Sequence, residues 1–504
     1  MDLPRSWLEG DHPLFRTSSP KASRLWWRQF HDPILDRLIT RCFRQNLNLQ
    51  TAALRIIEAR ARLGLAAATV FPQVQEAKGS LGTIGQPKAL GPPRSYDQAS
   101  FGFDLGWELD LWGKYARTAE SARAAYLATV AGYDDLMVSL SAEVARLYIE
   151  ICTLEERIRL AEKNVAIQES GLALVMDRFK EGTITELDVL QAKGLLAATR
   201  ATIPPLRAAL ATRRHALAVL LGMVPGELAP LLSRTSGIPK VEETLFIDAP
   251  ADLLRRRPDV RRAEMAAAAQ CARIGIARAD LLPSFTLVGS LSWNATDAGS
   301  DDLAGLFGGD NVAWVFGPAF VWKLFHYGRL HNQVRIQDAR YQQLLSQYRQ
   351  TVLNAAREVE DGLSLFWQSR QEAAAIRESL AASQKAMELS LIQYEEGLID
   401  YQRVLESTRS VTRKQDQYAL VRGKIATSAV FLYKALGGGW DERASRPELL
   451  PAEVRRAMEK RTDWGGLLAP RAAPAGTSTI PAADAPGRSG PVRRDQPTET
   501  TDGQ

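Results

Sequence analysis

The chain has 504 residues, of which 45% are hydrophobic, and 63 lysines and arginines stand against 58 aspartates and glutamates. Charged residues make up 24% of the chain, which excludes a wholly disordered polymer, and a net charge of +5 is too dilute to predict a nucleic-acid partner. The three cysteines are too few and too far apart for a disulfide framework, and no apolar run approaches the roughly 18 residues of a membrane-spanning helix.

The N-terminal segment, residues 1–25, is polar and contains several prolines and serines. A secretory signal requires a basic start, an apolar stretch and a small-residue cleavage site, and this segment has none of these features. Taken alone, this start predicts a chain that stays in the cytoplasm.

Residues 26–235 and 236–440 are two copies of one pattern. The stretch ARLGLAAATVFP at 61–72 matches ARIGIARADLLP at 272–283 with an offset of 211 residues. Further along the chain the offset is 215, and the four-residue slip predicts a loop of variable length between the two matches. Each copy is predicted to run helix, strand, loop, strand, long helix, turn, helix. The pairs at the larger offset include Gly113/Gly328, Glu181/Glu396 and Gly222/Gly437.

Each copy contains two predicted strands, at about 73–84 and 99–111 in the first and about 284–294 and 311–325 in the second. Apolar residues alternate with small or charged ones, as in a strand with one buried face. The length of about ten residues and the many aromatic rings favour a membrane strand over a strand in a soluble sheet. The residues predicted to face lipid are Phe101, Phe103, Leu105, Trp107, Phe316, Phe320 and Trp322.

Each copy continues into a predicted helical hairpin, at about 113–222 and about 328–437. The first long helix has no proline and is rich in Ala, Leu, Glu and Arg, and the second carries an apolar stripe at helical spacing. At ~1.5 Å per residue, each long helix would reach roughly 100 Å, a length that predicts coiled-coil packing.

Four strands cannot close a barrel by themselves, because small barrels need about eight, and open sheet edges are not tolerated in hydrocarbon. Strands in a membrane would therefore be pooled from several chains. Three chains would supply about twelve strands and give the simplest closure, although the residues alone do not fix that number.

The last segment, residues 441–504, holds eight of the 25 prolines together with many Gly, Ser, Thr and Ala residues. This composition predicts a largely disordered tail.

No sequence motif points to catalysis, to a metal or to another cofactor. The chain lacks a Gly-rich phosphate loop, an HExxH motif and a nucleophile elbow. His326 and His331 bracket a strand-to-helix turn but do not have helical ligand spacing. The basic cluster at 255–257 and 261–262 is interpreted as a linker that leads into a helix at Pro258, with Asp259 complementing the helix dipole.

Several motifs in order carry a resemblance to a known family. They are WWRQFHDPILDRLI, ARLGLAAATVFPQV, LALVMDRFKEGTITELDVLQAK, IPPLRAALATRRHALAVLLGMVPGEL and LLRRRPDVRRAE. Over about residues 26–440 the chain resembles the TolC-like outer membrane factors, and among them the NodT/OprM-type efflux outer membrane lipoproteins.

The resemblance implies a homotrimer with a twelve-stranded β-barrel in the outer membrane of a Gram-negative bacterium and a long α-helical coiled-coil tunnel in the periplasm. It implies a passive channel of a tripartite efflux system, which receives small molecules from an inner membrane transporter through a periplasmic membrane-fusion adaptor. The partners so implied are further copies of the chain, the adaptor, the transporter and outer membrane lipid.

The start of the chain departs from the family pattern. Relatives begin with a signal peptide that ends in a lipid-modified cysteine, whereas this sequence has no cysteine before Cys42. We therefore expect the true start of the protein to lie upstream of Met1.

By the same resemblance, the turns RFKEGTITELDVL and QYEEGLIDYQRVL form the periplasmic tips and contact the adaptor through Gly182, Thr183, Gly397 and Leu398. Turn chemistry alone also explains both glycines, because Gly tolerates the left-handed conformation that ends a helix. Both interpretations stay open at this point.

Relatives narrow the tunnel near the second tip, where this chain has Gln402, Arg403 and Glu406 on one helix face. The hypothesis is that an Arg–Glu network across the trimer axis holds a closed state, with Asp188 of the first tip as a weaker candidate. The alternative is an ordinary solvated ion pair, which contributes little.

Two other functions compete with efflux. The same architecture would serve as the exit duct of a protein or signal-lipid secretion system. A soluble coiled-coil scaffold is favoured by the missing signal alone, and the aromatic residues that stand in phase in both copies argue against it.

Overall fold

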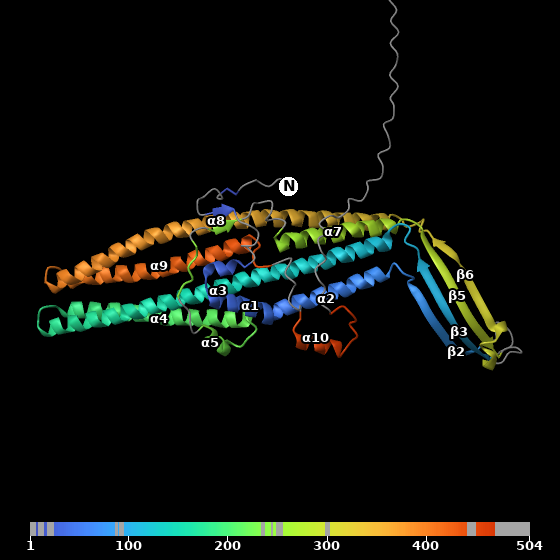
Figure 1. The fold of residues 1–504 in the computed structure, drawn as a ribbon, viewed down its shortest axis with the longest axis horizontal. Helices are drawn as coiled ribbons and strands as arrows, with labels where there is room; N and C mark the ends of the chain where they lie inside the picture. The colour runs from blue at the N-terminus through green and yellow to red at the C-terminus, as the bar shows by residue number, and fades with distance from the viewer. Residues whose placement is uncertain are drawn as a thin grey trace, which may run out of the picture.

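The computed structural model describes residues 7–8, 15–17, 25–85, 89, 95–232, 237–242, 245–247, 256–297, 303–440 and 450–468. These residues form a long helical body with a four-stranded sheet at one end and two helical hairpin tips at the other (Figure 1). The predicted fold class, mainly helical with a small β part, is confirmed.

The two copies have helices of equal length. Helices α2 (Leu47–Ala68) and α7 (Pro258–Ala279) each span 22 residues and begin 211 residues apart. The long helices α3 (Lys114–Lys180) and α8 (Arg329–Glu395) each span 67 residues and begin 215 apart. The return helices α4 (Glu186–Leu220) and α9 (Tyr401–Ala435) each span 35 residues at the same offset of 215. The predicted internal duplication is therefore confirmed helix by helix.

The main sheet contains β2 (Val74–Gly85), β3 (Ser95–Glu108), β5 (Ser284–Thr296) and β6 (Val312–Val321), in the order β2-β3-β5-β6. All neighbours are antiparallel, and β2 and β6 form the two edges. The copies meet between β3 and β5, so each copy supplies one adjacent strand pair.

Two strand boundaries differ from the prediction. The strand expected at 311–325 ends earlier, at Val321, because the Trp322 carbonyl accepts a hydrogen bond from the Leu324 amide at 3.1 Å and the chain leaves the ladder. Strand β3 begins at Ser95, before the expected 99, and ends at Glu108.

The main core lies midway along the molecule, where the N-terminal elements pack on the centre of α3 and on the C-terminal end of α9. The 3-10 helix η1 (Trp26–Phe30) places the Trp26 ring in a stack with Tyr433 at 5.5 Å between centroids. Helix α1 (Pro33–Gln45) begins at its cap Asp32, whose carboxylate accepts the Tyr148 hydroxyl at 2.7 Å. The long helices are thereby held together near their middle, and both ends project away from this core (Figure 1).

The start of each α2-type helix is joined to the end of the α4-type helix of the same copy. In the first copy, the Asn46 side-chain amide donates to the Leu220 carbonyl at 2.9 Å. The second copy has Arg257 at the equivalent place, and its guanidinium donates to the Ala435 carbonyl at 2.8 Å. Arg257 also pairs with Asp259 at 2.7 Å and Glu358 at 2.8 Å.

That pairing explains part of the basic cluster in the sequence. Arg257 is buried and joins the start of α7 to the end of α9. Arg262 forms an ion pair with Asp135 of α3 at 3.1 Å. Helix α7 does begin at Pro258 with Asp259 in its first turn, as the sequence indicated. Arg255 lies outside the described residues.

The C-terminal prediction is wrong for residues 450–468. Helix α10 (Ala452–Glu459) and the residues around it fold onto the body, with Leu450 and Met458 buried in the main core. Arg60 of α2 donates to the Leu467 carbonyl at 2.8 Å, so this segment lies beside α2 (Figure 1). A few apolar side chains outweigh the Pro- and Gly-rich composition here. The rest of 441–504 lies outside the described residues.

The remaining elements are short, and a two-stranded parallel pair joins the N-terminal segment to the linker between the copies. Among the described residues, no single helix is long and apolar enough to cross a membrane, although α4 and the segment Pro225–Leu232, bent by 98°, meet that criterion as a pair. The short elements are β1 (Phe15–Thr17), β4 (Leu245–Ile247), η3 (Pro225–Glu227), α5 (Ala229–Leu232), η4 (Leu303–Gly305) and η5 (Gly309–Asn311).

Candidate functional site: the sheet faces and the hairpin tips

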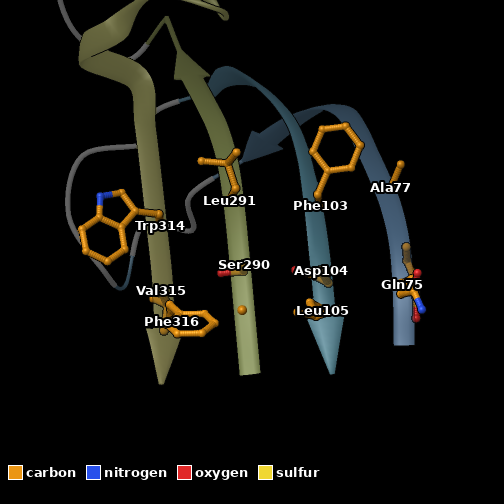
Figure 2. Close-up of a pocket in the computed structure, with 12 residues that line it drawn as sticks. Gln75, Ala77, Phe103, Asp104, Leu105, Ser290, Leu291, Trp314, Val315 and Phe316 are labelled. Carbon is orange, nitrogen blue, oxygen red and sulfur yellow. The ribbon is translucent and has the colours of Figure 1, made fainter. Parts of the chain in front are cut away.

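One face of the four-stranded sheet is apolar across three strands. Phe103 of β3 pairs with Leu291 of β5, which pairs with Trp314 of β6 (Figure 2). These rings and aliphatic chains lie around a shallow hollow of about 600 Å³. The predicted residues Phe101, Phe103, Leu105 and Trp107 share this face with Phe316 and Phe320, as the pairing register requires.

The opposite face is polar on β2, β3 and β5. Lys78 pairs with Asp104 at 2.7 Å and lies 3.5 Å from Glu76. The Ser80 and Ser100 hydroxyls share a hydrogen bond at 2.8 Å. A sheet that is apolar on one face and charged on the other suits a boundary between lipid and water.

Strand β2 is shifted by one residue relative to the other copy. In the second copy, Phe285 of β5 pairs with Phe320 of β6. By the offsets of 211 and 215, their counterparts in the first copy are Val74 and Leu105, which would lie opposite each other if both copies had the same register. Instead, Gln75 lies opposite Leu105. Because a one-residue slip turns every side chain to the other face, β2 contributes Gln75, Ala77 and Gly79 to the apolar side.

The two tryptophans predicted to face lipid also fasten the sheet to the helices. The Trp107 indole N–H donates to the Val70 carbonyl at 3.1 Å, and that of Trp322 donates to the Leu281 carbonyl at 3.3 Å. Both acceptors follow the end of the preceding helix of the same copy. Tryptophan suits such a place, because its ring is apolar while its N–H requires a partner.

The hairpin tips end in left-handed glycines. Gly182 has φ +74° and Gly397 has φ +77°. In each tip, the following amide bonds back into the helix: Thr183 N to the Arg178 carbonyl at 3.1 Å and Leu398 N to the Gln393 carbonyl at 2.8 Å. Both glycines therefore have the geometry of a helix-ending turn. Thr183 and Leu398 remain exposed at the tips, Leu398 to 68%.

The two tips contact each other through a residue that sequence reasoning missed. The Arg178 guanidinium donates to the carbonyls of Tyr394 and Glu395, both at 3.0 Å, and lies 4.6 Å from the Tyr394 ring centroid. The second copy has Gln393 at the equivalent position, and this difference alone does not reveal the contact.

Aromatic packing completes the contact between the tips. Tyr401, at the start of α9, lies 5.2 Å from the Tyr394 ring and packs with Val175 and Val189 of the first hairpin. Burial, reinforced by Tyr394 and Asp188, raises the pKa of Tyr401 to about 12, so the hydroxyl stays neutral at physiological pH.

The predicted gate residues lie near this contact but are not joined to one another. Gln402, Arg403 and Glu406 are exposed on the first turns of α9. Within one chain, Glu406 approaches Arg409 at 3.9 Å rather than Arg403. The Asp188 carboxylate accepts from the Thr185 amide at 3.1 Å and hydroxyl at 2.9 Å, so it caps the start of α4. An Arg403–Glu406 network across several chains stays a prediction.

No cluster of three or more His, Cys, Asp or Glu side chains suited to a metal occurs within the part of the chain that the structure describes. The features that stand out are surfaces: a two-faced sheet, its unpaired edges and a pair of exposed tips.

The chain is similar in sequence to a family of known proteins. The family model described as outer membrane efflux protein matches residues 38–223 and 249–438. The chain is 30% identical to nodulation protein T of Rhizobium leguminosarum bv. trifolii over 417 residues, which cover 82% of this chain and 88% of that protein. It is 31% identical to the pyoverdine export outer membrane protein OpmQ of Pseudomonas aeruginosa over 433 residues, or 83% and 88% of the two chains.

Solved structures agree with the sequence relatives. The structure of the outer-membrane channel OprN superposes with a TM-score of 0.81 at 31% identity and covers 87% of this chain and 97% of that one. A CusC structure superposes with a TM-score of 0.75 at 26% identity, over 87% of this chain and 97% of that one.

Proposed function

The chain belongs to the outer membrane efflux protein family, and from that premise we propose that it is the outer membrane channel of a tripartite efflux system. The observation that carries this proposal is the sheet, which is apolar on one face, polar on the other and unpaired at both edges. Such a sheet is stable in a bilayer once its edges are closed by other chains.

The internal duplication suggests how the edges close. Within one chain, β3 of the first copy pairs with β5 of the second. Strand β6 is the second-copy counterpart of β3, and β2 is the first-copy counterpart of β5. The same kind of pairing is therefore available between β6 of one chain and β2 of the next. Three chains with four strands each would close a barrel of about twelve strands with the charged face inward, as in membrane barrels with polar interiors.

The helices would continue this barrel as a periplasmic tunnel. At ~1.5 Å per residue, α3 and α8 are each roughly 100 Å long, and both hairpins point away from the sheet (Figure 1). The exposed tips, with Thr183 and Leu398 beside the two turn glycines, are then the surface for a periplasmic adaptor, which would link the channel to an inner membrane transporter.

The proposed task is passive transport of small molecules. Lys78, Glu76 and Asp104 on the polar face would line the barrel interior and influence which ions pass. Gln402, Arg403 and Glu406 would face the tunnel near its closed end, and a change in their contacts would open it.

Planar-bilayer recording of the purified protein tests the proposal. We expect discrete conductance steps, and we expect Lys78→Glu to shift permeability toward cations because it reverses a charge in the lumen. Lys460→Glu is the matched control, since it makes the same charge change next to α10 and away from the sheet. Absence of conductance, or the same selectivity shift in both variants, would refute the channel assignment.

A further inference from the structure

Two histidines come together at the strand-to-helix junction of the second copy. His326 precedes the turn after β6, and His331 lies in the first turn of α8. Their ring centroids are 5.1 Å apart, with the ring planes 34° from parallel. They are five positions apart in the sequence, so no helical or strand spacing would have revealed the pair.

The turn that brings them together is particular to this copy. Tyr327 has φ +46° and Gly328 has φ +80°, two consecutive left-handed residues that fold the chain back. A left-handed conformation is uncommon and energetically unfavourable for a residue with a bulky side chain. At the equivalent place in the first copy, Gly113 is left-handed at φ +73°, but Trp112 is not.

The side chains confirm that the two turns are built differently. The Trp112 indole donates to the Pro283 carbonyl at 2.7 Å, whereas Tyr327 is 98% exposed. Leu111 and Ala116 occupy the places of His326 and His331 in the first copy. The first copy therefore connects its strand and its long helix by a different turn and without either imidazole.

One nitrogen of the pair has no protein partner. His326 Nδ1 is shielded from solvent and makes no hydrogen bond among the described residues. A shielded polar atom without a protein partner is unfavourable, and a water molecule or a bound ion would satisfy it. The surrounding contacts do not explain why an imidazole, rather than the leucine of the first copy, stands here.

The spacing of the rings suits a shared metal ion. Two imidazole nitrogens at ~2.0–2.1 Å from one ion place their ring centroids about 4.5 Å apart at a 90° angle and about 5 Å apart at a tetrahedral angle. The observed 5.1 Å agrees with the tetrahedral value. The remaining coordination positions would be filled by water or by an exchangeable ligand.

The class of ion follows from the ligands at hand, because no carboxylate is grouped with the two histidines among the described residues. The second copy has Lys323 and Arg329 where the first has Glu108 and Lys114, and no described carboxylate lies within 4 Å of either cation. Mg²⁺ and Ca²⁺ prefer several oxygen ligands, which this junction does not offer. Imidazole suits Zn²⁺, Cu²⁺ and Ni²⁺, and Cu²⁺ binds such sites most tightly of the three.

We propose that His326 and His331 form a two-histidine binding site for a late first-row divalent transition metal, one site per chain. The site joins the end of β6 to the first turn of α8, so a bound ion would fasten the sheet to the second long helix. It does not depend on the transport role of the protein.

The test is Cu²⁺ titration of the chelator-stripped, full-length protein, followed by calorimetry and electron paramagnetic resonance. We expect one Cu²⁺ per chain with hyperfine coupling to two imidazole nitrogens. His331→Ala should weaken binding at least tenfold and leave one nitrogen, and the double variant His326→Leu/His331→Ala should remove the site. Mg²⁺ should not compete.

The controls separate ligation from folding. The double variant carries the residues that the first copy has at this junction, and His331 is exposed, so His331→Ala alone decides the matter if the double variant is unstable. His215→Ala, an exposed position on α4, should bind Cu²⁺ as the wild type does. Equal Cu²⁺ affinity and equal nitrogen coupling in the wild type and His331→Ala would overturn the proposal and leave the rings merely stacked.

Discussion

At the scale of residues, the two copies use different side chains for the same contact. Asn46 and Arg257 both donate to the last carbonyl of the return helix, but Arg257 adds ion pairs to Asp259 and Glu358. A buried cation that satisfies three acceptors is difficult to replace, because each partner is left without its hydrogen bond when it is removed.

We therefore expect Arg257→Ala to destabilise the protein by about 2 kcal/mol, since it removes the hydrogen bond to the Ala435 carbonyl and the ion pairs with Asp259 and Glu358. Thermal unfolding of the purified protein measures the effect. Arg278→Ala, exposed on the same helix, is the control and should change stability by less than about 0.5 kcal/mol. Equal unfolding temperatures for the two variants would contradict the assigned role of Arg257.

At the scale of elements, the helices could be predicted from the sequence because their pattern is long and repeated. Gly113 and Gly328, which are related by the constant offset, mark where the two long helices begin. Gly182 and Gly397 mark where these helices end. Other features depend on tertiary contacts that leave no periodic trace. The one-residue shift of β2, the docking of Met458 and the contact from Arg178 to Tyr394 belong to this second group.

The exposed tips carry a prediction that separates docking from turn formation. Leu398→Asp should abolish binding to the cognate adaptor, because it places a charge on an exposed apolar tip residue, while leaving thermal stability unchanged. Gly397→Ala should instead lower stability by about 1 kcal/mol, because its φ of +77° disfavours a Cβ. Pull-down with the adaptor and thermal unfolding measure the two effects, and normal adaptor binding by Leu398→Asp would exclude this residue from the docking surface.

The gate hypothesis also belongs to the elements, since it concerns the first turns of α9. Replacing both Arg403 and Glu406 with Ala should raise single-channel conductance, because the two charges would no longer hold the tunnel end closed. Arg409→Ala is an informative control, since Arg409 is the basic residue that lies near Glu406 within one chain. If the double variant conducts like the wild type, or Arg409→Ala alone has the full effect, the network between Arg403 and Glu406 does not form the gate.

At the scale of the whole molecule, the sheet of one chain requires partners that the chain itself does not supply. Among the described residues, neither edge of its sheet has a pairing strand, and its apolar face carries Trp314, Phe316 and Phe320, each at least 65% exposed. A soluble monomer would have to hide both features, whereas a barrel pooled from several chains satisfies the edges through pairing and the aromatic face through lipid.

The most direct measurement is fractionation of cells that express the native gene product, followed by gel electrophoresis of heated and unheated samples. We expect recovery in the outer membrane as a trimer-sized band that collapses to the monomer on boiling. A soluble monomer, with the same mobility before and after heating, would contradict it, because the sheet would then have neither lipid nor neighbouring strands.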